Sequence, residues 1–202
     1  MSYLTKTKMI TQQTILPLEH GNFTITYHKT DFGDCVSVHM GNLAQGVPIV
    51  RIHSSCLFGE AFHGLDCDCG SQLDAALRLI GKDGTGVVVY HYAEGRGVGL
   101  ERKIEALELQ RTQGLDTVES LAHMGLEPDL RTYGATLEAL SDLGVAKTIR
   151  AASQNPHKLD ALEQAGFVIA EIIQLDVPIT DLNKPELLTK KYKLGYLIDT
   201  IE

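Results

Sequence analysis

The order of strand-like and helix-like segments is the feature that most restricts the fold of this chain. Residues 48–55 (PIVRIHSS) are typical of a strand, 71–84 (SQLDAALRLIGKDG) of a helix and 86–92 (GVVVYHY) of a buried strand. In the helix, four apolar residues recur at helical spacing and two glycines are expected to end it: Leu73, Ala76, Leu77 and Ile80, then Gly81 and Gly84. A helix between two strands is typical of a crossover connection in an α/β protein.

The rest of the chain continues this pattern within one domain. Short alternating or apolar stretches before residue 56 indicate β structure, as in 22–29 and 35–40. Further segments follow in the order loop, helix, helix, strand, helix, strand: 93–98, 99–110, 131–144, 147–153, 156–166 and 167–175. No internal repeat and no linker rich in Pro, Gly or Ser interrupts them. We therefore predict a single compact α/β domain over residues 1–202, with a mixed sheet and flanking helices.

Three cysteines in one short stretch indicate a metal site. Cys67 and Cys69 form a Cys-x-Cys unit, and Cys56 lies eleven residues upstream of it. Three soft ligands without a clear fourth suit a tetrahedral zinc whose last position is left to water. Such an ion makes hydroxide available near neutral pH and polarises the bond under attack. The alternatives are core packing, redox use of the thiols, or disulfides in a secreted protein.

Composition and the first residues of the chain favour the metal interpretation. Residues 1–21 contain no continuous apolar stretch fit for a signal peptide, and no later run reaches membrane-spanning length. We therefore expect the protein in the reducing cytoplasm, where clustered cysteines favour a metal over a disulfide. The fourth thiol, Cys35, lies in a strand-like stretch and is expected to pack in the core. A formal charge of −8 disfavours nucleic acid and anionic membranes as partners.

Cationic residues at the ends of predicted elements indicate an anion pocket. Four of them lie at strand ends or loop-to-helix junctions: Arg51, Arg96, Arg131 and Lys158. Each alone would more often be a solvated surface charge, but their shared location supports a phosphate pocket beside the zinc. Arg51 and His53 end the strand that leads to Cys56 and are expected at the rim of the metal site. Metal-activated water beside such a pocket predicts hydrolysis of a nucleotide or sugar phosphate.

Asp129 and Lys158 both lie next to the start of a predicted helix, where a structural role must be weighed against a role in the pocket. Asp129 precedes Arg131 by two residues and is a candidate either for the pocket or for the N-cap of the next helix. Lys158 falls in the first turn of a predicted helix, where a cation opposes the helix dipole. That unfavourable placement indicates that Lys158 serves a ligand rather than the helix.

The successive motifs of the chain resemble those of the GTP cyclohydrolase II family of the riboflavin pathway. The matching segments are RIHSSC, CDCG with Gln72, HYAEGRGVGL, DTVES, DLRTYG and SQNPHKL, in unbroken order. The resemblance spans roughly residues 15–178 and leaves 179–202 as a tail, expected to form an edge helix or an oligomer contact. It implies an α/β homodimer with one catalytic zinc per subunit and magnesium on the triphosphate. The implied reaction converts GTP into a diaminopyrimidinone ribosyl phosphate, formate and pyrophosphate.

The resemblance also assigns individual residues. Cys56, Cys67 and Cys69 match the zinc ligands, Asp129 the proposed general base, and Arg131 the residue proposed to attack the α-phosphate. Because a protonated guanidinium is a poor nucleophile, charge stabilisation of the departing pyrophosphate is the more reasonable role for Arg131. The positions that match nucleotide contacts are Arg51, Ile52, His53, Ser54, Ser55, Gln72, Glu94, Gly95, Arg96, Thr117, Ser153 and Lys158.

Four positions depart clearly from the family pattern, and in a milder change Ser153 and Gln154 replace a family Thr and Asn. Ser55 stands where the family usually has Glu, and Ala93 where it usually has Gln. Glu105 and Leu107 occupy the places of a family Arg and a family Tyr. The family tyrosine is thought to assist at the metal, and leucine can neither donate nor accept a proton.

These departures leave three interpretations of function. The first is a zinc-dependent hydrolase that opens the imidazole ring of GTP and releases pyrophosphate and, if the second hydrolysis occurs, formate. The second is a divergent enzyme that stops at the formamide intermediate or acts on another purine or pyrimidine nucleotide. The third is a catalytically silent homologue that binds a nucleotide. The retained cysteines, Asp129 and Arg131 favour an enzyme.

Overall fold

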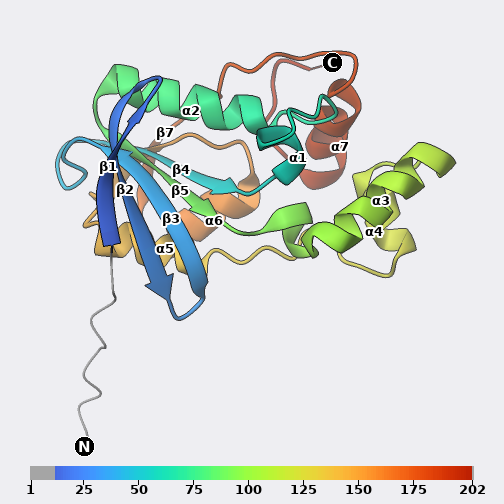
Figure 1. The fold of residues 1–202 in the computed structure, drawn as a ribbon, viewed down its shortest axis with the longest axis horizontal. Helices are drawn as coiled ribbons and strands as arrows, with labels where there is room; N and C mark the ends of the chain where they lie inside the picture. Colours follow the sequence, from blue (N-terminus) through green and yellow to red (C-terminus); the bar gives the residue numbers. More distant parts are fainter. Residues whose placement is uncertain (1–11, 202) are drawn as a thin grey trace, which may run out of the picture.

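A seven-stranded mixed sheet forms the centre of the computed structural model, which describes residues 12–201 (Figure 1). The strands lie in the order β1-β2-β3-β5-β4-β6-β7. Their bounds are β1 (Gln12–Leu18), β2 (Gly21–Thr30), β3 (Gly33–Met40), β4 (Ile49–Ser54), β5 (Gly86–His91), β6 (Thr148–Ala151) and β7 (Val168–Ile172). The pairs from β1 to β5 in this order are antiparallel, and those from β5 to β7 are parallel. This confirms the predicted α/β class and the mixed sheet.

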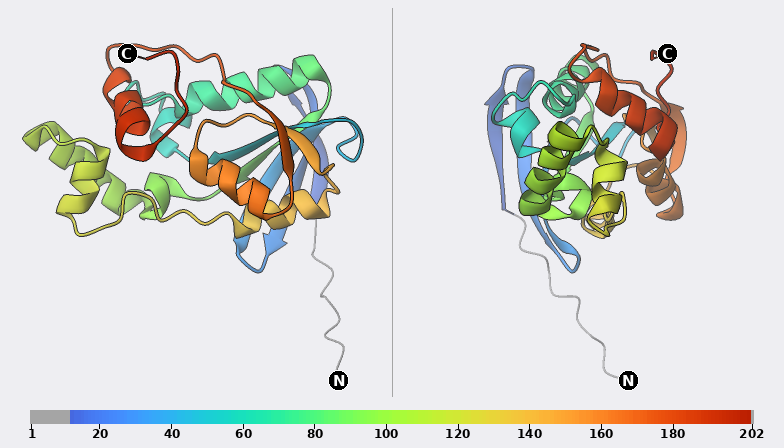
Figure 2. Two further views of the ribbon diagram at one scale, coloured as in Figure 1. Left: turned by 180° about the vertical axis from the view of Figure 1, so that it is seen from behind. Right: turned by 90° about the vertical axis from the view of Figure 1, so that its right-hand side faces the viewer.

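Helices cover both faces of the sheet and enclose two cores (Figure 2). The helices are α1 (Leu57–Glu60), α2 (Cys69–Asp83), the 3-10 turn η1 (Glu94–Gly97), α3 (Gly99–Gln113), α4 (Thr117–His123), α5 (Gly134–Asp142), α6 (Pro156–Gln164) and α7 (Lys184–Leu194). Successive residues of β5 face opposite cores: Val87 and Val89 pack toward α5 and α6, and Val88 packs toward α2. β4 and β5 are therefore buried on both faces, which explains their continuous apolar sequences.

The predicted end of α2 at Gly81 is wrong. Helix α2 continues to Asp83, and only Gly84 ends it, in the left-handed conformation with φ 85°. Gly81 lies inside the helix, and a larger residue does not fit there because a Cβ atom would stand 2.2 Å from the carbonyl oxygen of His20. This glycine serves the close approach of the helix to the β1–β2 turn.

Helices α3 and α4 extend from one end of the molecule, beyond the sheet (Figure 1). Helix α3 agrees with the sequence prediction, whereas α4 was not predicted. A capping box starts α4: Asp116 accepts from the backbone N–H of Glu119, and the Glu119 side chain accepts from the backbone N–H of Asp116. Within residues 12–201, no helix combines the length and the apolar character needed to cross a membrane.

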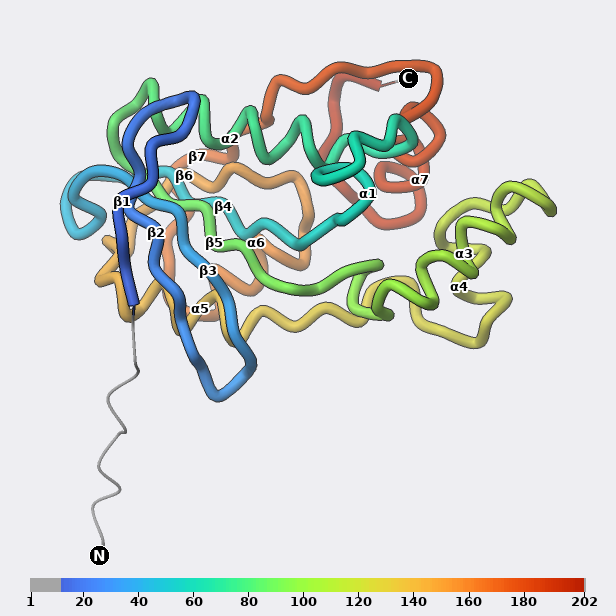
Figure 3. Tube along the Cα trace, viewed as in Figure 1, coloured from blue at the N-terminus to red at the C-terminus, as the bar shows by residue number. Residues whose placement is uncertain are grey.

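The C-terminal tail forms α7, which contacts α4 and the N-terminal end of α2. Leu187 is 3% exposed, so this helix has a buried face of its own. Its place is at the end of the sheet where β4 and β5 finish, as the trace in Figure 3 shows. The predicted oligomer contact of the tail stays a prediction.

Candidate functional site

A cavity of 530 Å³ lies beyond the carboxyl ends of β4, β5 and β6. This is the position where open α/β sheets bind ligands, and the volume is within the usual range for small-molecule sites. Segments distant in sequence converge there: the loop after β4, the η1 turn after β5, the loop after β6, and helices α3 and α7 (Figure 3). The sequence-predicted residues that line it are Arg51, His53, Ser54, Ser55, Cys56, Cys67, Cys69, Gln72, Glu94, Gly95, Arg96, Thr117, Arg131, Ser153 and Lys158.

Two predicted site residues lie behind the cavity wall. The side chain of Ile52 is 1% exposed and packs in the core between the sheet and helices α5 and α6. Its carbonyl oxygen accepts a hydrogen bond from Lys158 Nζ at 3.0 Å. Asp129 does not cap α5, because Tyr133 is the N-cap residue of that helix. Asp129 instead binds Arg131, which reaches the cavity.

The three predicted metal ligands form one cluster. The Sγ atoms of Cys56, Cys67 and Cys69 all lie within 4.8 Å of one another, and Cys56 Sγ is 3.8 Å from Cys67 Sγ. Sulfurs bound to one tetrahedral zinc at about 2.3 Å would be about 3.8 Å apart, so the thiols fit this ion. In the described part of the chain, no fourth Cys, His, Asp or Glu joins this group. The donor set therefore leaves one tetrahedral position to a non-protein ligand.

Two glycines make room for the sulfurs. A Cβ atom on Gly59 would stand 2.8 Å from Cys67 Sγ and 3.4 Å from Cys56 Sγ. A Cβ atom on Gly70 would stand 2.3 Å from the carbonyl oxygen of Gly59. The starts of α1 and α2 therefore touch through their backbones, and this contact brings Cys56 beside the Cys-x-Cys unit.

Lys103 of α3 is a neighbour of the cluster that sequence reasoning missed. Its ammonium lies 3.2 Å from Cys56 Sγ and 2.6 Å from Glu94 Oε1. Hydrogen bonds from Cys67 and Cys69 lower the pKa of Cys56, and the Gly59 N–H and the Lys103 charge add to this effect. The same bond from Cys56 raises the pKa of Cys67. The cluster thus holds a thiolate at Cys56, the form that binds metal.

Glu60 fixes the backbone of Cys56 and was also missed. Its Oε1 accepts from the Cys56 N–H at 2.9 Å and pairs with His53 Nε2 at 3.0 Å, while Oε2 accepts from the Tyr90 hydroxyl at 2.7 Å. Arg51 Nε donates to His53 Nδ1 at 3.2 Å, which assigns the ring proton of His53 to Nε2. Burial, followed by the charges of Arg51 and Lys158, holds the pKa of His53 well below its ordinary value. His53 is therefore a neutral link between Arg51 and Glu60.

Arg51 and Lys158 are buried cations without a carboxylate partner among residues 12–201. Arg51 donates to the Ala152 carbonyl at 2.8 Å and to Gln72 Oε1 at 2.6 Å. Burial lowers the pKa of Arg51 to about 10, and burial together with the charges of Arg131 and Arg51 holds the pKa of Lys158 well below its ordinary value. A ligand anion in the cavity would relieve this unfavourable charge.

Arg131 and Asp129 form a buried, multiply bonded pair. Arg131 Nε donates to Asp129 Oδ1 at 2.8 Å, and Nη2 donates to Asp129 Oδ2. The remaining donors reach Ser54 Oγ at 3.3 Å and the Tyr196 hydroxyl at 3.2 Å. Burial opposes the ionised form of Asp129, but the bonds from Arg131 outweigh it, so the pKa of Asp129 is lowered. Asp129 therefore orients the guanidinium, whose outer edge faces the cavity.

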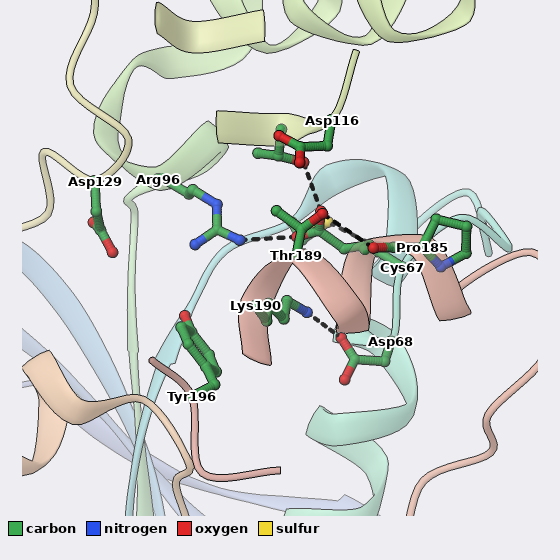
Figure 4. Close-up of polar contacts among 12 residues, drawn as sticks. Cys67, Asp68, Arg96, Asp116, Asp129, Pro185, Thr189, Lys190 and Tyr196 are labelled. Carbon is green, nitrogen blue, oxygen red and sulfur yellow. Dashed lines mark hydrogen bonds and ion pairs between the residues drawn. The ribbon is translucent and has the colours of Figure 1, made fainter. Parts of the chain in front are cut away.

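Arg96 has a strained backbone and an unsatisfied donor. Its φ of 59° is in the left-handed region, which non-glycine residues rarely adopt. The strain is held by the Leu130 N–H, which donates to the Arg96 carbonyl at 2.9 Å. Arg96 Nη2 donates to Glu186 Oε1 of α7 at 2.8 Å, whereas Nη1 is buried without a hydrogen-bond partner (Figure 4). This donor is therefore available to a ligand in the cavity that Arg96 lines.

Three of the four positions that depart from the family pattern line the cavity: Ser55, Ala93 and Leu107. Leu107 follows Lys103 by one helical turn, so both side chains lie on the face of α3 that reaches the thiol cluster. Glu105 does not line the cavity; it is exposed and pairs with Arg102. Of the four departures, Glu105 is therefore the one with no direct route to a ligand.

Comparisons with known proteins agree with the geometry of the site. The family model described as GTP cyclohydrolase II matches residues 8–174. A GTP cyclohydrolase-2 of Archaeoglobus fulgidus is 42% identical over 180 residues, which cover 89% of this chain and 47% of that protein. The GTP cyclohydrolase-2 of Actinobacillus succinogenes is 40% identical over 96% of this chain and 90% of its own length. A riboflavin biosynthesis protein RibBA of Chlorobium phaeovibrioides is 41% identical over 91% of this chain and 45% of its own length.

This chain thus spans about half the length of several curated relatives that it matches, and nearly all of another. The identity exceeds 30% over most of the chain, and residues 8–174 include the three cysteines of the cluster and the four cations predicted for the phosphate pocket. The chain belongs to the GTP cyclohydrolase II family.

Proposed function

We propose that this protein is a zinc-dependent hydrolase that opens the imidazole ring of GTP and releases pyrophosphate, with formate following if a second hydrolysis occurs. The observation that carries the proposal is the thiol cluster with tetrahedral spacing beside a cavity that holds two unpartnered cations. Family membership and relatives named GTP cyclohydrolase-2 support GTP as the substrate. The cytoplasm as its location is part of the same proposal.

Cys56, Cys67 and Cys69 would hold the zinc through their thiolates. When bound, zinc supplies a Lewis acid and lowers the pKa of water at its open position. Lys103 balances part of the negative charge of the three sulfurs, and Glu60 fixes the loop that presents Cys56. Magnesium would enter with the triphosphate as part of the substrate.

The cations of the cavity would bind and orient the nucleotide. Arg51 and Lys158 have no competing carboxylate and are the strongest candidates for phosphate contacts. Arg131 would stabilise the charge that develops on the leaving pyrophosphate, because Asp129 holds its guanidinium in place before the substrate arrives. Arg96 offers its unpaired Nη1 to the same ligand.

The direct test combines metal analysis with identification of products. Purified protein should contain about one zinc per chain, and with GTP and magnesium it should form pyrophosphate and a ring-opened nucleotide detectable by mass spectrometry. Removal of zinc with a chelator should abolish turnover, and zinc should restore it. A metal-free protein that turns over GTP at the same rate would contradict the proposal. A panel of other nucleoside triphosphates tests the substrate base.

Leu107 supports a second candidate function, in which the reaction ends at the formamide intermediate. The side chain lines the cavity on the face of α3 that reaches the cluster, and it cannot transfer a proton. Leu107→Tyr is expected to raise formate release per pyrophosphate by about 100-fold, the lower end of the range for general acid–base catalysis. Quantifying both products in the same reaction measures this ratio. Equal amounts from the unchanged protein would rule out the formamide candidate.

Lys158 predicts how nucleotide affinity depends on pH. Its pKa in the free protein is well below the ordinary value, and a bound phosphate would raise it, so binding takes up a proton between the two values. Affinity for a non-hydrolysable GTP analogue should therefore fall as pH rises through this window. Burial also lowers the pKa of His91, to about 3, and that of His53, so neither histidine titrates near neutral pH.

Calorimetry in two buffers of different ionisation enthalpy counts the protons taken up by the holoprotein. Lys158→Met should remove this uptake and weaken binding by about 10-fold or more, which corresponds to the loss of one charge-assisted hydrogen bond. Unchanged proton uptake in this variant would assign the effect to another group.

A nucleotide-binding protein without catalysis is the remaining alternative. The retained Asp129–Arg131 pair and the open tetrahedral position favour an enzyme. Zinc removal separates the two, because an enzyme loses turnover whereas a binding protein changes only in affinity or stability. The homodimer implied by the family is likewise a proposal, and measurement of the molar mass in solution by light scattering would test it.

A further inference from the structure

We propose that Lys190 of α7 is a positioning residue for the metal loop, and that docking of α7 and zinc binding therefore support one another. The inference rests on the zinc site proposed above and deepens it. It concerns the C-terminal tail, in which Lys190 forms a buried ion pair with Asp68, the middle residue of the Cys-x-Cys unit.

Asp68, the residue between Cys67 and Cys69, carries the first step. Asp68 and Lys190 are both buried, with 2% and 7% of their surfaces exposed, and Asp68 Oδ1 lies 2.6 Å from Lys190 Nζ (Figure 4). Asp68 is also the N-cap residue of α2, a position where aspartate normally accepts from the helix backbone. Here its side chain makes no capping bond. The carboxylate turns instead to Lys190, so the ion pair replaces the local role of this residue.

The contact continues from the metal loop to the cation of the phosphate pocket. Gln72 Nε2 donates to Asp68 Oδ2, and Gln72 Oε1 accepts from Arg51 Nη2 at 2.6 Å. One buried chain of polar contacts therefore joins α7, the Cys-x-Cys unit and Arg51. Lys190 provides the charge at one end of it.

Charge explains why the loop depends on Lys190. Without its ammonium, the Asp68 carboxylate would remain buried between two cysteines that must be thiolates to bind zinc. Breaking a buried ion pair by removing one partner leaves an uncompensated charge, which is strongly unfavourable. Burial alone would lower the pKa of Lys190, but Asp68, Glu186 and Cys69 outweigh it, so the ammonium persists at neutral pH.

A second ion pair fixes the same helix to the opposite wall. Glu186 Oε1 accepts from Arg96 Nη2 at 2.8 Å, and Glu186 Oε2 accepts from the Thr117 hydroxyl at 2.6 Å. Helix α7 is thus held between the metal loop and the η1 turn, and Figure 4 shows Arg96 and Asp68 on opposite sides of Lys190. Because coupling between two sites is reciprocal, ordering the metal loop with zinc should also stabilise α7.

The experiment measures zinc affinity by competition with a chelator in the full-length chain. Lys190→Met is expected to weaken zinc binding by about 10-fold or more, as is usual for partners that orient metal ligands. Lys184→Met removes a charge from the same helix at an exposed position that forms no ion pair among residues 12–201, and should leave the affinity unchanged. Lys190→Arg should recover most of the loss. Adding Asp68→Asn to Lys190→Met should cost less than the two single changes together, because no unpaired carboxylate remains.

Hydrogen exchange gives a second readout, which is independent of the affinity measurement. Zinc should slow exchange of the amides in Lys184–Leu194, and this protection should disappear in Lys190→Met. Equal zinc affinity of Lys190→Met and unchanged protein, or zinc binding without protection of α7, would overturn the inference while leaving the proposed function intact. Failure of the unchanged protein to bind zinc would overturn both.

Discussion

Replacing Cys56 by serine should reduce zinc affinity by more than 100-fold and abolish turnover of GTP. Changes to outer partners of a metal site already cost 10- to 100-fold, and Cys56 is itself one of only three protein donors in the described cluster. Its thiolate also accepts from Gly59 N–H and lies 3.2 Å from Lys103 Nζ, so serine would lose the charge that both contacts favour. Zinc content after dialysis and chelator competition measure the effect.

Cys35→Ser is the matched control for Cys56→Ser. Cys35 is fully buried in the core and donates to the Ala135 carbonyl, a contact that a serine hydroxyl can also make. Burial raises the pKa of this thiol to about 11, so it is uncharged at neutral pH. The control should keep a full complement of zinc and lose at most some stability. Retention of zinc by Cys56→Ser at chelator concentrations that the control also tolerates would refute the three-thiolate site.

Replacing Arg131 by methionine is expected to lower kcat/KM for GTP by about 100-fold or more, the usual effect of removing a preorganised charge donor. It should also lower the free energy of unfolding by about 3 kcal/mol, because Asp129 then remains buried without its partner. Steady-state kinetics and urea denaturation of the holoprotein measure the two effects.

The double variant Asp129→Asn with Arg131→Met separates stability from catalysis. Removing the orphaned carboxylate should recover much of the lost stability, whereas activity should stay low because the guanidinium is still absent. Recovery of activity together with stability would show that Arg131 acts only through the fold. A loss of activity without any loss of stability would mean that Asp129 finds another partner.

The sequence predicted the central fold and most of the cavity for identifiable physical reasons. Strand–helix–strand order specifies parallel pairing, and the carboxyl ends of parallel strands meet at one edge. Arg96 and Lys158, which follow β5 and β6, therefore share one cavity, and Arg51 reaches it from within β4. The short Cys-x-Cys spacing likewise places Cys67 and Cys69 together without any long-range information, whereas Cys56 joins them through the contact between Gly59 and Gly70.

The features that escaped prediction depend on contacts between distant residues. Helix α4 is short and owes its start to a capping box, and Gly81 is explained only by its approach to His20 in another element. Lys190 and Asp68 are separated by 122 positions, and no local pattern marks either as half of a pair. Glu60 could have been suspected because it follows Cys56 by four residues, whereas the contact of Lys103 with Cys56 appears only in the folded chain.

The backbone contact between Gly59 and Gly70 has a consequence for how this enzyme family can diversify. Main-chain atoms hold Cys56 beside the Cys-x-Cys unit, and this contact involves none of the side chains at the positions that depart from the family pattern. Substitutions such as those at Ser55, Ala93 and Leu107 can then accumulate around an anchor that stays in place. New reaction outcomes could thus evolve here without rebuilding the thiol cluster proposed to hold the zinc.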